Sequence, residues 1–235
     1  MNHHWKSSYF EQNIAHKSLM KILALTDIHA AYDTVERILA DEHGCHAMIL
    51  GGDLTTHGTA EEAAEALKRF SRTGIPLYSV AGNMDPRSLE DTFSRYSTLV
   101  NGRGVFLDDV GIFGVSGSPP TPMNTPYEIA EEEIALRAHS GWKDVQAARI
   151  KIFVPHAPPR GTKVDAIRTG QHVGSTAVRK FVEQCHPDAV VCGHIHEARG
   201  IDAIGSTVVV NCGPAMKGYY AILTVGKGVS VELKG

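Results

Sequence analysis

KILALTDIH, at residues 21–29, sets the architecture of this chain. The apolar run at 21–26 predicts a short buried strand, and Asp27 and His29 follow it directly. Next, Asp33 with Glu36 resembles a capping box and predicts a helix that continues to about residue 42. A second apolar run at 47–50 then predicts another buried strand, so the chain begins as strand, helix, strand.

The same order repeats downstream. Thr59 with Glu62 predicts the start of a second helix, which stops at Gly74. Residues 75–81 predict a third strand, which leads into the sequence GNMDP at 82–86. Two consecutive strand–helix units imply a parallel sheet with right-handed crossovers.

The rest of the chain predicts further helices and strands. Helices are expected at 87–98, 127–139 and 176–185, and strands at 105–109, 112–115, 150–154, 189–192, 208–211, 221–225 and 229–233. The strands from residue 189 onward are expected to form a second sheet region. Four prolines at 116–126 predict an exposed loop on the substrate side.

Composition narrows the class of protein. The chain has 235 residues, of which 43% are apolar and 21% charged, as in a globular protein. Residues 1–19 mix polar types and predict a disordered extension before one domain at 20–235. A net charge of −3 makes nucleic acid an unfavoured partner, and no apolar run reaches the roughly 20 residues of a membrane span. Four scattered cysteines without a CxxC pair suit the reducing cytoplasm.

Metal-ligating side chains follow the predicted strands. Because ligands bind at the carboxyl ends of strands in open α/β sheets, we expect these donors to converge. They are Asp27, His29, Asp53, Asn83, His156, His194 and His196. Carboxylate, imidazole and amide donors without a thiolate suit Mn, Fe, Zn or similar divalent ions. Seven donors exceed one tetrahedral site, so the set divides into two ions about 3.5–4 Å apart, with Asp53 bridging them.

Each short motif means little when it stands alone. A single Asp-x-His pair is common, and Gly-Asp after a strand is often only a turn. The chain has no GxSxG, GxxxxGK or HExxH motif, and no GxGxxG after a strand. Asn211, in the sequence NCGP at 211–214, either lines the site or shapes the turn.

Five motifs in order resemble the calcineurin-like metallophosphoesterase superfamily, from about residue 21 to the C-terminus. They are DxH at 27–29, GD at 52–53, GNxD at 82–85, His156, and GHxH at 193–196. The chain looks closest to the small stand-alone phosphoesterases related to Icc-type phosphodiesterases. The resemblance implies an α/β fold, a four-layered α/β/β/α sandwich of two mixed sheets flanked by helices.

The resemblance also implies how two divalent metal ions are held. Asp27, His29 and His196 would bind the first, Asn83, His156 and His194 the second, and Asp53 would lie between them. Manganese is the preferred ion, with Fe, Zn, Ni and Co as alternatives.

One position departs from the family pattern. The family usually has His where this chain has Met84, and that His helps bind the scissile phosphate and protonate the leaving group. Loss of a general acid costs about 10²–10⁴-fold in rate. His57, His172 and Arg168 could replace it, and His172 is favoured because it precedes a helix start on the substrate side. Asp85, the other candidate for the catalytic machinery, is expected to orient a neighbouring ligand.

The expected function is hydrolysis of phosphodiesters or small phosphomonoesters, nucleotides among them, by in-line attack of a hydroxide bound to both metals. One alternative is a catalytically weak metal-binding scaffold, as in the superfamily's retromer subunit, because Met84 replaces the usual His. The other is a nuclease subunit, which the absence of a basic cluster disfavours. The exposed edge strands or the hairpin near 105–115 could support a homodimer.

Overall fold

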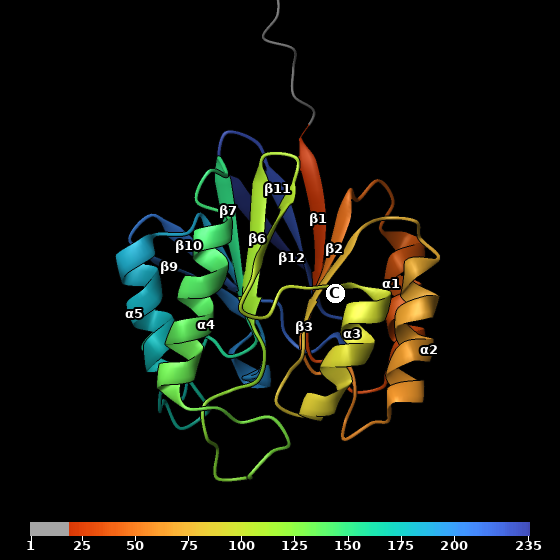
Figure 1. The fold of residues 1–235 in the computed structure, drawn as a ribbon, viewed down its shortest axis with the longest axis horizontal. Helices are drawn as coiled ribbons and strands as arrows, with labels where there is room; N and C mark the ends of the chain where they lie inside the picture. Colours follow the sequence, from red (N-terminus) through yellow and green to blue (C-terminus); the bar gives the residue numbers. More distant parts are fainter. Residues whose placement is uncertain (1–18) are drawn as a thin grey trace, which may run out of the picture.

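Two six-stranded mixed sheets lie face to face in the computed structural model, which describes residues 19–235. The predicted extension therefore lies outside the described residues, apart from its last position. Helices cover the outer face of each sheet, so the layers run helix, sheet, sheet, helix (Figure 1). The predicted four-layered α/β/β/α sandwich is confirmed.

The first sheet has the strand order β12-β11-β1-β2-β3-β4. Its strands are β1 (Met20–Leu25), β2 (Ala47–Gly51), β3 (Leu77–Val80), β4 (Thr98–Leu99), β11 (Tyr220–Val225) and β12 (Val229–Lys234). Strands β1 to β4 are parallel, and β11 pairs with β1 in the antiparallel direction. Helices α1 (Tyr32–Asp41), α2 (Ala60–Ser71) and α3 (Glu90–Tyr96) lie on its outer side (Figure 1).

The second sheet has the strand order β5-β6-β7-β8-β10-β9. Its strands are β5 (Gly104–Leu107), β6 (Val110–Val115), β7 (Ile150–Pro155), β8 (Ala189–Cys192), β9 (Gly200–Ile204) and β10 (Thr207–Asn211). Helices α4 (Glu131–Asp144) and α5 (Thr176–Cys185) cover it. Short 3-10 turns occur at η1 (Arg87–Leu89), η2 (His196–Ala198) and η3 (Ala215–Lys217).

The period-two pattern of the strands divides the apolar side chains between two cores. In β1, Leu23 and Leu25 pack toward the helices, whereas Ile22 belongs to the cluster between the two sheets. Ile112 and Ile152, from the second sheet, belong to that same inner cluster. Both faces of each central strand are thus buried. This packing holds the strands in place, and with them the carboxyl ends that the ligands follow.

Four predictions about elements need correction. The strands at 220–225 and 229–234 join the first sheet beside β1, not the second sheet region. Residues 98–99 form the edge strand β4, although residue 98 was predicted as the end of a helix, and β9 was not predicted. Helix α4 starts at Glu131, because Tyr127 and Ile129 instead donate backbone hydrogen bonds to Asn83 and Ser118.

The two predicted capping boxes differ in outcome. The Thr59 side chain accepts a hydrogen bond from Glu62 N at 3.2 Å and caps α2, as predicted. Helix α1 instead has Ala31 at its N-cap without a side-chain bond. Asp33 and Glu36 lie on the surface of α1, where both bind the guanidinium of Arg69 from α2.

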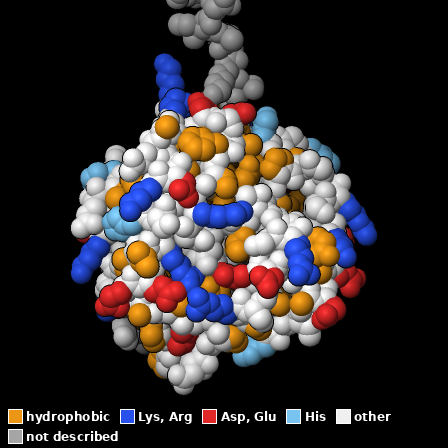
Figure 2. Space-filling view, viewed as in Figure 1, with side chains coloured by type: hydrophobic (Ala, Val, Ile, Leu, Met, Phe, Trp, Pro, Cys, Tyr) orange, Lys and Arg blue, Asp and Glu red, His pale blue; other side chains and the backbone are white. Residues whose placement is uncertain are grey.

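The described surface is mixed in charge. On the face shown in Figure 2, Lys and Arg side chains are interspersed with Asp and Glu. No helix in residues 19–235 combines the length and apolar character needed to cross a bilayer.

Candidate metal centre

The seven predicted ligands converge where the two sheets meet. Asp27 and His29 follow β1, Asp53 follows β2, and Asn83 follows β3, all at the carboxyl edge of the first sheet. His156 follows β7, and His194 and His196 follow β8, at the same edge of the second sheet. Hydrogen bonds join the edges, because Asp27 accepts from the backbone N–H of His194 at 3.0 Å.

Three ligands form a first group. Asp27, His29 and His196 each place one donor atom within 4.8 Å of the others. His196 Nε2 lies 3.3 Å from Asp27 Oδ1 and 3.2 Å from His29 Nε2. A carboxylate oxygen and two imidazole nitrogens at this spacing fit one divalent ion.

Asn83 is the centre of a second group. Its Oδ1 lies 2.9 Å from His156 Nε2 and 2.7 Å from His194 Nδ1. The two imidazoles come from different strands and aim their nitrogens at the same oxygen. These donors are the ones that the resemblance assigned to the second metal.

Asp53 lies between the two groups. Its Oδ2 is 3.6 Å from His29 Nε2 in the first group and 3.5 Å from His156 Nε2 in the second. Its other oxygen accepts a hydrogen bond of 2.8 Å from the backbone N–H of Met84. One carboxylate oxygen is therefore held by the backbone, and the other faces both sets of donors.

Hydrogen bonds also orient the imidazoles. His156 Nδ1 lies 2.8 Å from the carbonyl oxygen of Gly51, which assigns the proton to Nδ1 and leaves Nε2 as the ligand atom. His29 Nδ1 lies 3.0 Å from Thr56 Oγ1, so its Nε2 faces the site. Such partners fix the tautomer and the ring orientation that a metal needs.

Four residues of this cluster adopt an uncommon backbone conformation. Asp27, His29, Asp53 and His194 all have positive φ, at 55°, 46°, 52° and 66°. This left-handed region is uncommon for residues other than glycine, and strained residues cluster at functional sites. The chain thus adopts costly turns where they direct donor atoms into the centre.

Two glycines make room for these turns. A Cβ on Gly193 would overlap Asp27 Oδ2, and one on Gly82 would overlap Asp53 Oδ1. Any side chain at either position would displace a carboxylate of the cluster.

The cluster carries strongly perturbed protonation equilibria. Burial opposes protonation of His156, but the carboxylate of Asp53 outweighs it and raises the pKa of His156 to about 9. Burial and the nearby charge of His156 lower the pKa of His194 to about 4. Burial would raise the pKa of Asp27, yet the hydrogen bond with His196 and the charge of His156 hold it well below its usual range. The two buried carboxylates of Asp27 and Asp53 thus create a site that favours positive charge.

Asp85 lies beneath the centre and acts through its neighbours. Its buried carboxylate accepts hydrogen bonds from the N–H groups of Leu54, Thr55 and Gly82 and from the Thr55 hydroxyl, at 2.8–3.1 Å. Burial and the charge of Asp53 raise the pKa of Asp85 to about 6. It is placed to position the loops after β2 and β3.

The candidate replacements for the missing acid lie in different places. His172 pairs with the buried Asp165, at 2.7 Å, and its side chain is 44% exposed. Arg168, from the same loop, lines the pocket that contains His194 and His196. His57 is exposed, and its backbone N–H donates to the carbonyl of Met84 at 3.0 Å.

Other sequence predictions around the site are now located. Asn211 is fully buried, donates to Ile195 O at 2.9 Å and accepts from Gly213 N, so it shapes the turn. The proline-rich loop is tied to the segment just before Asn83, because Gly117 N donates to Ala81 O at 2.9 Å. In Figure 1 this loop extends from the end of the molecule opposite the start of β1.

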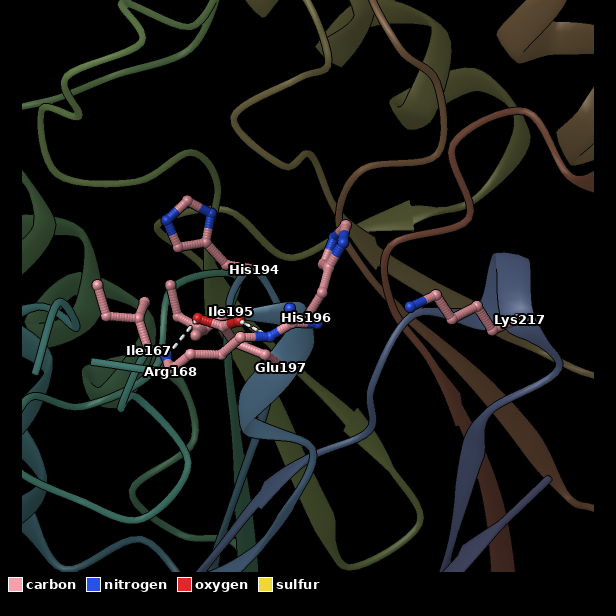
Figure 3. Close-up of a pocket in the computed structure, with 7 residues that line it drawn as sticks. All are labelled: Ile167, Arg168, His194, Ile195, His196, Glu197 and Lys217. Carbon is pink, nitrogen blue, oxygen red and sulfur yellow. Dashed lines mark hydrogen bonds and ion pairs between the residues drawn. The ribbon is translucent and has the colours of Figure 1, made fainter. Parts of the chain in front are cut away.

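Lys217 is among the pocket residues that the sequence analysis did not single out. The pocket encloses about 280 Å³ and is lined by Ile167, Arg168, His194, Ile195, His196, Glu197 and Lys217. Lys217 extends from η3 toward the His196 side of the pocket (Figure 3). The sequence signal that could have found it was the NCGP turn just before η3.

Comparisons with known proteins identify a family for this chain. A family model described as calcineurin-like phosphoesterase matches residues 20–198. The chain belongs to the calcineurin-like phosphoesterase family. Membership implies a hydrolase that acts on phosphoesters and uses divalent metal ions.

The relatives and solved structures are similar over most of the chain. The protein MJ1162 of Methanocaldococcus jannaschii is 34% identical over 206 residues, covering 86% of this chain and 90% of that protein. The UPF0046 protein K07C11.7 of Caenorhabditis elegans is 26% identical, covering 85% and 71%. The crystal structure of TT1561 of Thermus thermophilus matches with a TM-score of 0.71 at 18% identity, covering 92% and 99%. A 5′-nucleotidase of Candida albicans matches at 0.55 and 14%, covering 91% of this chain and 50% of that one. These two structures support the fold alone.

Proposed function

We propose that this chain hydrolyses phosphodiesters or small phosphomonoesters, nucleotides among them, with two divalent metal ions held by the seven clustered ligands. The supporting observation is the position of Asp53, whose Oδ2 lies 3.5–3.6 Å from an imidazole nitrogen of each donor group. A carboxylate between two sets of donors suits a ligand shared by two ions.

The donor chemistry fits this proposal. The cluster offers two buried carboxylates, an amide oxygen and four imidazoles, without a thiolate. Manganese is the proposed metal because carboxylate and amide oxygens suit it, with Fe, Zn, Ni and Co as alternatives because imidazole also suits such ions. A reducing compartment such as the cytoplasm is also proposed, since Cys45, Cys185, Cys192 and Cys212 are free.

The residues of the chain divide the work of hydrolysis. When bound, two divalent ions activate a water and stabilise the charge that develops on the phosphoryl group. Asp53, held by Met84 N, and His156, held by Gly51 O, keep their donor atoms fixed during the reaction. The water oxygen joins phosphorus and the bond to the leaving group breaks. The proton of the water moves to the departing oxygen or, where that oxygen leaves as a stabilised anion, to solvent.

Met84 limits which leaving groups depart readily. Its side chain has no proton to give, and the absence of a general acid costs about 10²–10⁴-fold for leaving groups that need protonation. Aryl esters and anhydrides depart as stabilised anions and are affected less. The proposed enzyme therefore prefers such substrates to esters of simple alcohols.

The test uses metal-stripped protein titrated with Mn²⁺ in the presence of bis-p-nitrophenyl phosphate or p-nitrophenyl phosphate. Turnover should appear with Mn²⁺, vanish in an Asp53→Asn variant, and persist in an Asp41→Asn control at the exposed end of α1. Two bound metals without turnover of either ester would contradict the proposal and favour the catalytically weak scaffold.

A further inference from the structure

The turn that carries Lys217 is fixed against the metal centre. Ala215 N donates to Thr26 O at 2.8 Å, and Met216 N donates to Asp27 O at 3.3 Å. Pro214 also forms a parallel bridge with Thr26. The backbone at 214–216 is thus tied directly to the residues at the end of β1, so the root of the Lys217 side chain has a set position relative to Asp27.

Lys217 differs from the other cation of the pocket in its partners. The Arg168 Nε lies 3.0 Å from Glu197 Oε2, and Arg168 N donates to Glu197 Oε1 at 2.7 Å. That pair is neutral overall. Within residues 19–235, by contrast, no ion pair involves Lys217, although its side chain lines the same pocket as His194 and His196 (Figure 3).

We propose that Lys217 is a specificity-determining residue that binds the extra negative charge of a phosphomonoester, so that the site favours monoesters over diesters. This inference rests on the function proposed above. The pocket, of about 280 Å³, accommodates a small phosphoester. Near pH 8 a monoester phosphate is close to doubly charged, because its second pKa is about 6, whereas a diester carries one charge. An ammonium without a carboxylate partner therefore gains more from the monoester.

Under this proposal, Lys217 supplies a positive charge that Met84 lacks. The family's usual His at this position contributes a cation or proton donor toward the phosphate, and Met84 contributes neither. Lys217 lies far from Met84 in the sequence, and it lines the pocket and supplies a positive charge there. It acts by binding the ground-state anion and is not assigned a proton transfer.

The experiment compares Lys217→Met with Lys227→Met, a control in the turn between β11 and β12 at the opposite edge of the first sheet. With Mn²⁺ present, Lys217→Met should lower kcat/KM for p-nitrophenyl phosphate about 10-fold through KM, while bis-p-nitrophenyl phosphate changes about 2-fold or less. Lys217→Arg should recover most of the loss. Calorimetry should show inorganic phosphate binding about 10-fold more weakly to the Mn²⁺-loaded Lys217→Met variant.

The outcomes separate this inference from the function on which it rests. Equal losses for both esters, or unchanged kcat/KM for the monoester, would overturn the role of Lys217 while leaving the hydrolase intact. Wild-type protein that turns over neither ester would overturn the proposed function instead. In that case, unchanged phosphate binding by Lys217→Met would overturn the inference as well, and weakened binding would support Lys217 as an anion-binding residue.

Discussion

Asp85 connects the loop after β2, which presents Asp53, to the loop after β3, which presents Asn83. Its carboxylate accepts hydrogen bonds from backbone N–H groups of both loops. We predict that Asp85→Asn destabilises the metal-free protein by about 2–4 kcal/mol, since buried N–H donors would face an amide NH₂ group. Burial and the repulsion from Asp53, which together raise the pKa of Asp85 to about 6, offset part of this loss.

Urea unfolding measures the effect of this substitution. Asp41→Asn, at the exposed C-terminal end of α1, should change the free energy of unfolding by no more than about 0.5 kcal/mol. Equal stability of Asp85→Asn and wild type would mean that the four hydrogen bonds do not hold the loops.

The ligand residues of the metal cluster could be predicted from the sequence. Each of the seven predicted ligands follows a predicted strand, and the carboxyl ends of strands share an edge. The positions of Arg168 and Lys217 could not be predicted in this way. Their location depends on loops folded by contacts between distant residues, such as Arg168 with Glu197 and η3 with Asp27.

Helix α2 depends at its start on the Thr59 cap, whose hydroxyl accepts from Glu62 N. Thr59→Ala should cost about 1 kcal/mol, because the N–H of Glu62 loses its acceptor. Thr59→Ser keeps an equivalent hydroxyl and should remain close to wild type. Thermal unfolding of the three proteins checks the order, and a stable alanine variant would mean that water replaces the cap at no cost.

The loop after β8 depends on Gly193, since a Cβ there would overlap the carboxylate of Asp27. We predict that Gly193→Ala weakens Mn²⁺ binding about 10–100-fold, the range seen when the support of a metal ligand is lost. Gly228→Ala, where a Cβ meets nothing within 4 Å, is the matched control. Calorimetric titration decides, and equal affinities would show that Asp27 has room to shift.

The sequence predicted individual helices and strands better than the pairing of strands within the sheets. Helix α5 was predicted with its observed bounds, because Ser175 and a period-3.6 apolar face mark it locally. The pairing of β11 with β1 joins residues about 200 positions apart, and no local pattern indicates it. The two-residue strand β4 is too short to show any alternation.

At the scale of the whole molecule, the inner core holds the two sheets together. Ile112 lies in this core with no exposed surface, so Ile112→Ala should cost about 2–5 kcal/mol and Ile112→Val about 0.5–1.5 kcal/mol. Because β11 and β12 return to the first sheet after the second is complete, both halves should unfold together. Far-ultraviolet circular dichroism and the fluorescence of Trp142, on α4, measured in a Trp5→Phe variant, should give coincident urea transitions. Separate transitions would contradict this coupling.

The layered fold could be predicted from the order of elements and from the resemblance. The oligomeric state could not. β5 is an edge strand of the second sheet, with Phe106 48% exposed. The homodimer expected through this hairpin stays a prediction.

The number of metal ions bound per chain tests the central claim most directly. Metal-stripped protein is saturated with Mn²⁺, freed of excess ion, and measured by plasma mass spectrometry beside an Asp53→Asn variant. The arrangement of two donor groups around Asp53 predicts two ions per wild-type chain and fewer in the variant. One ion or none in the wild type, or an unchanged count in the variant, would contradict it.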